Sequence, residues 1–494
     1  MSPPHHATTL PADKARLDLL LHLSTSYLAA NGVLIKPKLS TDNTNNPTWV
    51  SQANLIAPAS LTPSPLPKEC FYNAIRLQPV MNKLYRKLAQ DSTFIHNTIS
   101  SICNYDSFTA NLYDIFKKSE LLAKKQPISL DINRSDYLLH QEQGLNPQFK
   151  QVEFNTISIS FSSLSAQVGH LHRFLQKRFD YKDTMPGQNI TPDKLPQNES
   201  LTSIADGLAS AFKAYASPKA VVLLVGQVGE RNVFDQQLIE LQLFERHGIP
   251  LIIRSLEQVI DQGILKSDGE KQILIVDGFE VAVAYYRAGY TPADYPTQKE
   301  WDARLMIETS YAIKSPSVAY QLVGTKKVQQ VLFTPGIIEQ YLTSKQEVEE
   351  IRSFFVDLFP LDQTENGIKA YESALLNPEL YVLKPQREGG GFNTYGKDIP
   401  GMLETLGQEE RQAYILMKLI NAPTQHSVFL RNGEMEVVES ISELGVYGIY
   451  VANNEEVLVN KAGGHLLRSK PSESNEGGVA SGYAVLDSPY LVEE

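Results

Sequence analysis

The chain has 494 residues, of which 42% are hydrophobic and 20% are charged, and this is the composition of a folded globular protein rather than a disordered one. Its 45 Lys and Arg against 56 Asp and Glu give a formal net charge of −11, which argues against a general binder of nucleic acid or of anionic membranes. At roughly 150 residues per domain, the length suggests about three domains.

Cysteine usage and the N-terminal residues bear on the cellular compartment. Cys70 and Cys103 are too few for a disulfide framework or a CxxC metal knuckle, although a single bridge between them stays open. Residues 1–9 lack the basic and apolar regions of a secretory signal, and no run of 18 apolar residues indicates a membrane helix. We therefore expect a cytoplasmic protein without a membrane partner.

The first 200 residues change from a helical to an extended pattern. Apolar residues at helical spacing predict a helix over 12–31, with Gly32 just past its end. The proline-rich residues 57–68 predict an extended connection on the surface, and a mostly helical stretch follows to about Lys125. The pattern then predicts, in order, strands over 128–132 and 151–154, a long helix over about 162–179 and a linker over 182–199.

An α/β module is predicted from about residue 219 to 323. An apolar run over 220–225, an amphipathic helix over 234–247 and a second apolar run over 250–253 form a βαβ pattern, which indicates a parallel sheet. Further strands of this module are predicted over 272–276 and 280–286.

Past residue 330 the predicted order ends in antiparallel strands. The elements are, in order, a helix over 337–358, a strand over 381–383, a glycine loop, a helix over about 399–407 and a strand over 413–417. Asn432-Gly433 lies between two apolar runs and predicts a type I′ hairpin, and Asn453-Asn454 marks another turn.

The most informative segment is a glycine-rich loop directly after the strand that ends at Lys384. The three glycines at 389–391 let backbone N–H groups approach an anion, and Lys384 adds positive charge for a phosphate. Glu388 could hold a divalent cation that bridges phosphate oxygens. The alternative is a glycine hairpin with scattered charges. A Walker-type P-loop is rejected, because Asp398 stands where that motif needs Ser or Thr.

Two further patterns point to an anionic ligand and a cation. Small residues over 477–482 follow Arg468 and Lys470, which suggests a mobile lid, with a flexible surface loop as the alternative. Glu153 and Asn155 are two residues apart at a strand end, so both side chains can face the same way. A carboxylate and an amide oxygen suit magnesium, although such a pair is often only a cap.

Polar residues also follow two strands of the predicted α/β module. Glu230 and Asn232 lie at the carboxyl end of a parallel-type strand, where such sheets place ligands. Arg287 follows the strand over 280–286, and a guanidinium suits bidentate binding of a carboxylate. The alternative for each is a surface loop or a helix cap.

Together these segments resemble eukaryotic-type glutathione synthetase, an ATP-grasp ligase family. The resemblance runs in the family's order from about residue 66 to 490, and KPQREGGG and the ERN–FDQ block are its most specific parts. The matching stretches are RSDY (134–137), QVEFNTISISF (151–161), ERNVFDQ (230–236), YYRAGY (285–290), GTKKVQQ (324–330), VLKPQREGGGFNTYG (382–396), YILM (414–417), ISELGVYG (441–448), GHLLRSK (464–470) and GGVASG (477–482).

The resemblance implies a mixed α/β (α+β) chain with a circularly permuted ATP-grasp fold and an inserted parallel-sheet substrate-binding domain. The implied domains are an N-terminal helical and ATP-grasp portion (1–218), the α/β substrate-binding domain (219–330) and an ATP-grasp portion with the glycine-rich loop and the lid (331–494). The implied reaction joins γ-glutamylcysteine and glycine to give glutathione, ADP and phosphate through an acyl phosphate. ATP would be a co-substrate, with two Mg²⁺ per active site, in a cytoplasmic homodimer that binds no nucleic acid.

The resemblance also assigns roles to residues. It implies catalytic roles for Arg134, Lys326, Lys384 and Arg468, and magnesium ligation by Glu153, Asn155 and Glu388. Its implied ATP contacts are Glu153, Lys326, Lys384, Glu388, Gly389, Gly390, Gly391, Asn393, Tyr395, Met417, Lys418, Leu419, Ile420, Glu443, Lys470 and Glu476. Its implied substrate contacts are Arg134, Ser158, Ser160, Glu230, Asn232, Gln236, Arg287, Tyr290, Arg468, Val479 and Ala480.

Two departures from the family pattern leave alternatives open. Lys418 stands where relatives often carry an acidic residue, and Ser481 stands where alanine is common. Ser481 could alter the choice of the second substrate, so a related tripeptide synthetase that uses β-alanine or serine is one alternative. A catalytically inactive nucleotide-binding scaffold is the other, and the presence of Arg134, Lys384 and Glu388 argues against it.

Overall fold

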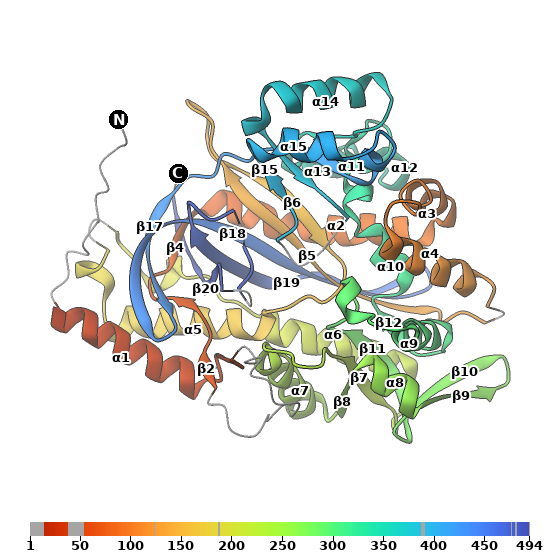
Figure 1. Ribbon diagram of the computed structural model, residues 1–494. Helices are drawn as coiled ribbons and strands as arrows, with labels where there is room; N and C mark the ends of the chain where they lie inside the picture. Colours follow the sequence, from red (N-terminus) through yellow and green to blue (C-terminus); the bar gives the residue numbers. More distant parts are fainter. Residues whose placement is uncertain are drawn as a thin grey trace, which may run out of the picture.

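The computed structural model describes residues 14–37, 54–122, 124–185, 188–386, 391–475, 477–479 and 482–493. It is a mixed α/β structure in which a long central sheet lies between a smaller sheet with α14 and α15 and a separate α/β layer near α7–α9 (Figure 1). Within these residues, no helix is long and apolar enough to cross a membrane. The expected mixed α/β class is therefore confirmed.

The central sheet has seven strands in the order β17-β3-β20-β19-β18-β5-β6. Its strands come from distant parts of the chain, and their bounds are β3 Ala59–Ser60, β5 Ile128–His140, β6 Gln148–Asn155, β17 Gln425–Arg431, β18 Glu434–Asn453, β19 Glu456–Pro471 and β20 Val485–Asp487. Asn432 (φ 50°) and Gly433 (φ 84°) connect β17 to β18. Both residues have positive φ, as a type I′ turn requires, so the predicted hairpin is confirmed.

Helices cover the two faces of this sheet unequally. On one face, Leu444 and Val446 pack against Phe71 and Ala74 of α2 (Lys68–Gln90). On the other face, Tyr447, Ile449 and Val451 of β18 pack against α5 (Ser162–Arg178) and α6 (Ser200–Tyr215). Side chains alternate between faces along a strand, so Glu443 and Gly445 share the second face, beyond the part that α5 and α6 cover.

A second sheet has six strands and includes the predicted βαβ unit. β7, β8, β11 and β12 pair in parallel, and α7 (Val233–His247) connects β7 to β8. β10 instead pairs antiparallel with both β9 and β11, because tight turns join these three consecutive strands. The bounds are β7 Val221–Val225, β8 Leu251–Arg254, β9 Gly263–Asp268, β10 Lys271–Val276, β11 Phe279–Tyr286 and β12 Ile313–Ser315. The expectation of a parallel sheet is thus correct for part of this sheet only.

A third sheet of four strands, in the order β13-β16-β14-β15, carries the start of the glycine-rich loop. Its strands are β13 Leu358–Phe359, β14 Tyr381–Lys384, β15 Thr394–Tyr395 and β16 Ile415–Lys418. Leu383 and Leu416 pack against α14 (Glu365–Leu376) and α15 (Asp398–Thr405). All of the strand pairs in this sheet are antiparallel.

These three sheets are accompanied by further helices and short strands. The helices are α1 Lys14–Ala30, α3 Ser92–Ile99, α4 Ser107–Glu120, α8 Leu256–Gln262, α9 Gln298–Thr309, α10 Val318–Val323, α11 Lys326–Phe333, α12 Ile338–Tyr341 and α13 Lys345–Phe354. The short strands are β1 Leu34–Ile35, β2 Leu55–Ile56, β4 Ser64–Pro67 and β21 Pro489–Val492.

Several expectations need correction. Residues 57–68 are mostly buried and contain β3 and β4, because β4 pairs with β21 from the end of the chain. The strand expected at 128–132 continues to His140, and the helix expected over 337–358 is divided into α12, α13 and the strand β13. α6 and α14 have no counterpart among the elements expected from the sequence.

Gly448 lies where β18 meets α2, and it offers a test of this packing. The interface holds a buried amide network in which Gln78 donates to Asn82 (3.0 Å) and to Asn133 (2.8 Å). A Cβ at Gly448 would lie 2.1 Å from Asn82 Oδ1 and 2.3 Å from Asn133 Oδ1. Such a clash forces polar side chains out of their hydrogen bonds.

We predict that Gly448→Ala lowers the free energy of unfolding by about 1–3 kcal/mol, as overpacked cores do. Denaturant unfolding followed by circular dichroism measures this loss. Gly401→Ala is the matched control, because nothing lies within 4 Å of a Cβ there, inside α15. Equal stability of Gly448→Ala and wild type would contradict the packing described.

Candidate functional site

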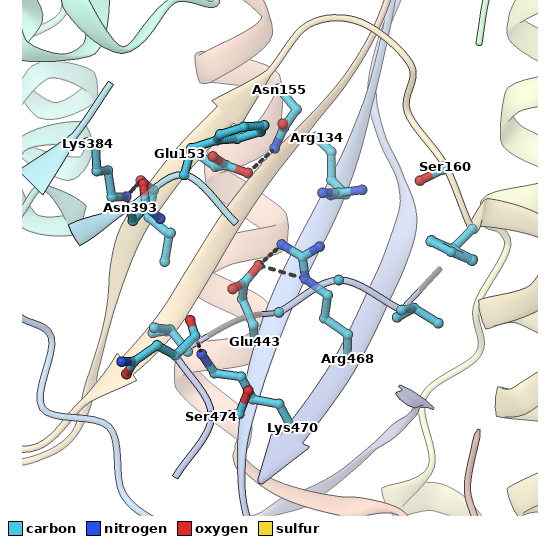
Figure 2. Close-up of a pocket in the computed structure, with 18 of the residues that line it drawn as sticks. Arg134, Glu153, Asn155, Ser160, Lys384, Asn393, Glu443, Arg468, Lys470 and Ser474 are labelled. Atoms are coloured by element: carbon cyan, nitrogen blue, oxygen red, sulfur yellow. Dashed lines mark hydrogen bonds and ion pairs between the residues drawn. The ribbon is translucent and has the colours of Figure 1, made fainter. Parts of the chain in front are cut away.

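A cavity of about 800 Å³ is lined by residues from the central and four-stranded sheets, from the loops that follow β7 and β11 of the six-stranded sheet, and from the loop between β6 and α5. Figure 2 shows cationic and acidic side chains facing one another across it. One wall is the face of the central sheet that α5 and α6 leave open. Lys384 at the end of β14 and Lys326 at the start of α11 border this wall, beside Val152 and Glu153 of β6.

Strand register brings the polar side chains of this wall together. Arg134 on β5 lies opposite Asn155 on β6, and Asp136 lies opposite Glu153. On the other side of β5, Asp136 lies opposite Gly445 of β18, and further along β18 Glu443 lies opposite Arg468 of β19. Residues two apart share a face of a strand, so these groups form one continuous polar surface.

Two arginines on this surface share a buried carboxylate. Arg134 donates to Asp136 through Nε (2.5 Å to Oδ1) and through Nη2 (2.6 Å to Oδ2). Arg468 Nη2 lies 3.4 Å from Asp136 Oδ2, and Arg468 also donates to Glu443 Oε1 through Nε (2.9 Å) and Nη2. Burial disfavours the charged form of Arg134, but Asp136 outweighs this and raises the Arg134 pKa. Both guanidinium groups therefore stay cationic in a mostly buried position.

Glu153 is surrounded by positive charge. Burial acts to raise its pKa, but Lys326, Lys384 and the two arginines outweigh burial and lower the pKa to about 2. Lys326 Nζ lies 3.7 Å from Glu153 Oε2, and Lys384 Nζ donates to the Val152 carbonyl (3.1 Å). Asn155 Nδ2 donates to Glu153 Oε1 (3.1 Å), as Figure 2 shows. Glu153 is thus ionised at neutral pH in a site that favours further negative charge.

The segment at the end of β16 forms a mainly apolar end of the cavity. Met417–Ile420 lie along it, and the apolar side chains of Leu138, Val152, Val382 and Ile441 also line the cavity. Lys418 is exposed, and its Nζ lies 3.9 Å from Asp357. An apolar slot beside the end of a strand suits an aromatic base.

The opposite end of the cavity is built by the loop between β6 and α5 and by the six-stranded sheet. Ser158 (φ 54°) and Phe161 (φ 66°) have left-handed backbone conformations, which for non-glycine residues cost energy and cluster at functional sites. Asp235 of α7 holds this loop by accepting from the backbone N–H groups of Phe161 (2.9 Å) and Ser163 (2.8 Å). Arg287 pairs with Asp235 at 3.0 Å.

Residues that flank the two glycine-rich segments contact each other at the cavity. Tyr395 Oη donates to the Asn475 carbonyl (3.3 Å), and Lys470 Nζ donates to the same carbonyl (2.9 Å). Asn393 Nδ2 in turn donates to Tyr395 Oη (3.3 Å). The Asn475 carbonyl therefore joins Tyr395 of β15 to Lys470 of β19.

The structure brings most of the expected site residues to this one cavity. Those that line it are Arg134, Glu153, Asn155, Ser158, Ser160, Glu230, Asn232, Arg287, Tyr290, Lys326, Lys384, Asn393, Tyr395, Met417, Lys418, Leu419, Ile420, Glu443, Arg468, Lys470 and Val479. Gln236 does not line it, because it is buried behind Glu230, to which it donates at 3.2 Å. Gly391 also lies off the lining. Glu388, Gly389, Gly390, Glu476 and Ala480 lie outside the described residues.

The sequence analysis missed two acidic residues that organise the site. Asp136 and Asp235 are both buried and contact arginines that line the cavity. Their sequence signal was present, since Asp136 lies two residues after Arg134 and Asp235 lies within the ERN–FDQ block. Within the described ranges, no group of three or more His, Cys, Asp or Glu side chains could hold a metal ion.

Known proteins resemble this chain over nearly its whole length. The family model of the eukaryotic glutathione synthase ATP binding domain matches residues 14–491. Glutathione synthetase of Homo sapiens is 40% identical over 487 residues, covering 98% of this chain and 99% of that protein. Chloroplastic glutathione synthetase of Solanum lycopersicum is 41% identical over 439 residues, covering 88% of this chain and 78% of that protein.

A solved structure extends the comparison to the fold. A glutathione synthetase-like effector from Globodera pallida, in its apo form, matches 99% of this chain and 100% of its own, with a TM-score of 0.73 and 24% identity. At 24% identity, this structural similarity supports only the assignment of the fold. The family match over residues 14–491 and the 40% identity to the human relative show that this chain belongs to the eukaryotic glutathione synthase family.

Proposed function

We propose that the protein is an ATP-dependent ligase that joins γ-glutamylcysteine and glycine to give glutathione, ADP and phosphate. Family membership supports the reaction. The observation that carries the proposal is the ring of Lys326, Lys384, Arg134 and Arg468 around Glu153 on one cavity wall. Such a wall suits phosphoryl transfer, which needs charge neutralisation and alignment more than a side-chain nucleophile.

ATP fits the part of the cavity between Met417–Ile420 and the two lysines. The adenine would lie in the apolar slot, and Lys326 and Lys384 would meet the phosphates. Glu443, Lys470, Asn393 and Tyr395 would complete the ATP contacts. Glu388, Gly389, Gly390, Gly391 and Glu476 remain predicted ATP contacts from the resemblance.

The oxygen ligands on this wall fit magnesium. Glu153 is a carboxylate, and Asn155 donates its amide nitrogen to Glu153 and Asp136, which leaves the amide oxygen for a cation. We propose Glu153 and Asn155 as ligands, with Glu388 as the third, for the two Mg²⁺ that the resemblance implies. Bound Mg²⁺ would neutralise charge on the transferred phosphate.

The chemical steps follow from the charges. One oxygen of the cysteinyl carboxylate would attack the γ-phosphorus of ATP, and ADP would leave, giving an acyl phosphate. Arg134 and Arg468 would stabilise the transferred group and the oxyanion that forms when the amine attacks the carbonyl carbon. Phosphate would then leave with the attacking carboxylate oxygen as the new amide bond forms.

The remaining contacts would place the two amino-acid substrates and exclude water. Ser158, Ser160, Glu230, Asn232 and Arg287 line the end of the cavity where the dipeptide would bind. Its other expected contacts are Gln236, Tyr290, Val479 and Ala480. The contact between Tyr395 and Asn475 would help to close the cavity, because an acyl phosphate hydrolyses in water.

Three broader proposals accompany the reaction. We propose that residues 219–330 form a substrate-binding domain inserted between ATP-grasp portions at 1–218 and 331–494, that the chain forms a homodimer, and that it acts in the cytoplasm. Sedimentation of the purified protein tests the dimer. Cell fractionation tests the location, which matters because two plant relatives are named chloroplastic.

Release of ADP by the purified protein tests the reaction. With Mg²⁺ and ATP, we expect release only when γ-glutamylcysteine and glycine are both present, because the acyl phosphate needs the first and turnover needs the second. Strong release with β-alanine or serine in place of glycine would reassign the acceptor. No release from folded protein that still binds ATP would indicate an inactive scaffold.

Glu153→Gln tests the proposed cation site. We expect kcat/KM for ATP to fall about 100-fold or more, because a metal ion supplies several kcal/mol of charge stabilisation in such transfers. Metal-free ATP should bind at least as tightly as to wild type in calorimetry, because the surrounding cations remain. Glu142→Gln is the control, since that carboxylate is 55% exposed and lies off the cavity. Weakened binding of metal-free ATP would contradict the assignment.

A further inference from the structure

Asp136 is in an unusual position for an acidic residue beside a ligand cavity. It is 1% exposed and does not line the cavity, yet three side chains that do line the cavity donate to it. Its Oδ2 accepts from Arg134 Nη2 (2.6 Å), Asn155 Nδ2 (2.9 Å) and Arg468 Nη2 (3.4 Å). Asp136 can therefore influence a ligand in the cavity only by way of these three residues.

Both arginines donate to carboxylates through the same two nitrogen atoms, Nε and Nη2. Arg134 uses Nε and Nη2 for Asp136, and Arg468 uses Nε and Nη2 for Glu443 and Asp136. Neither Nη1 makes a hydrogen bond to any of the described residues, and both residues line the cavity. Each guanidinium thus keeps one amino group for an anionic ligand, and Figure 2 shows the two groups near each other.

Two neighbouring guanidinium groups repel each other unless a counter-ion lies between them. An anionic substrate would supply that counter-ion only after binding. The buried carboxylate of Asp136 supplies it in the free protein, so the arginines need not reorganise when the substrate arrives. Preorganised charge of this kind is the most effective form of transition-state stabilisation.

Gly445 shows that the backbone around this pair is adapted to it. Gly445 lies directly opposite Asp136 on β18. A Cβ there would lie 2.7 Å from Arg134 Cδ and 2.8 Å from Asp136 Oδ1. The absence of a side chain at residue 445 therefore leaves the space in which Arg134 lies against Asp136.

We propose that Asp136 is a positioning residue, which holds Arg134 and Arg468 in the orientation that stabilises the transferred phosphoryl group. This inference rests on the proposed ligase reaction. It adds to that reaction a residue that touches no substrate and acts through the two arginines.

Asp136→Asn tests the inference, because it keeps the shape of the side chain and removes its charge and one acceptor oxygen. We expect kcat per folded molecule to fall roughly 10- to 100-fold, the size of loss that misplaced catalytic groups cause. KM for the dipeptide should rise, while KM for ATP should stay within about twofold of wild type. Loss of folded protein alone would lower the apparent kcat without changing either KM.

Asp131→Asn is the matched control. Asp131 lies on the same strand, is 1% exposed and lies 3.7 Å from Arg86, but it does not line or contact the cavity. We expect kcat per folded molecule to be unchanged in this variant, even where its thermal stability falls. An equal fall of kcat in both variants would overturn the specific role of Asp136.

A double-mutant cycle shows whether Asp136 acts through Arg134. Added to Arg134→Ala, Asp136→Asn should lower activity by a smaller factor than it does in wild type, because one of the two arginines that it positions is gone. Losses that multiply would overturn the inference. Should these variants fail to fold, Gly445→Ala is the alternative, because it keeps both charges and displaces Arg134. We expect it to lower kcat by at least 10-fold. An unchanged kcat in Gly445→Ala would also overturn the positioning role of Asp136.

The two proposals can fail separately. If wild type has no ligase activity, the proposed function fails. If wild type is active and Asp136→Asn stays within twofold of its kcat, only the positioning role fails.

Discussion

Several positive charges crowded around one carboxylate are the constraint that the site must satisfy. Lys326, Lys384, Arg134 and Arg468 all act on Glu153, and their combined attraction outweighs its burial. Unpaired charges in such a place would be expensive, so each arginine is matched by a buried or half-buried carboxylate. In the proposed reaction, this arrangement would hold the cations in place for a polyanionic ligand.

Strand register in the central sheet brings these charged side chains together, and the local sequence alone does not. β6, β5, β18 and β19 lie side by side, although they come from segments about 300 residues apart along the chain. A shift of one residue in any of these strands would turn its polar side chains to the α2 face. Long strands fix the register, and the packing of α2, α5 and α6 against both faces maintains it. The interactions that stabilise the fold therefore also determine the geometry of the site.

The sequence was informative where structure is local. The Asn432-Gly433 turn, the α7 helix and the strand before Lys384 follow from turn chemistry and periodicity, and each lies where the pattern predicts. Residues 57–68 were placed on the surface because proline-rich composition shows only that a segment is not helical. Their burial depends on the pairing of β4 with β21, more than 400 residues away, and nothing local indicates it. Asp136 was missed for a similar reason, since its contact with Arg468 depends on strand pairing across β18.

We propose that this wall of cations activates a carboxylate by phosphoryl transfer. The most direct test uses γ-glutamylcysteine with both oxygens of its cysteinyl carboxylate labelled with ¹⁸O, together with Mg²⁺, ATP and glycine, and mass spectrometry of the released phosphate. The account predicts one ¹⁸O atom in each phosphate, because the oxygen that attacks phosphorus leaves with it. Unlabelled phosphate formed together with glutathione would contradict the account.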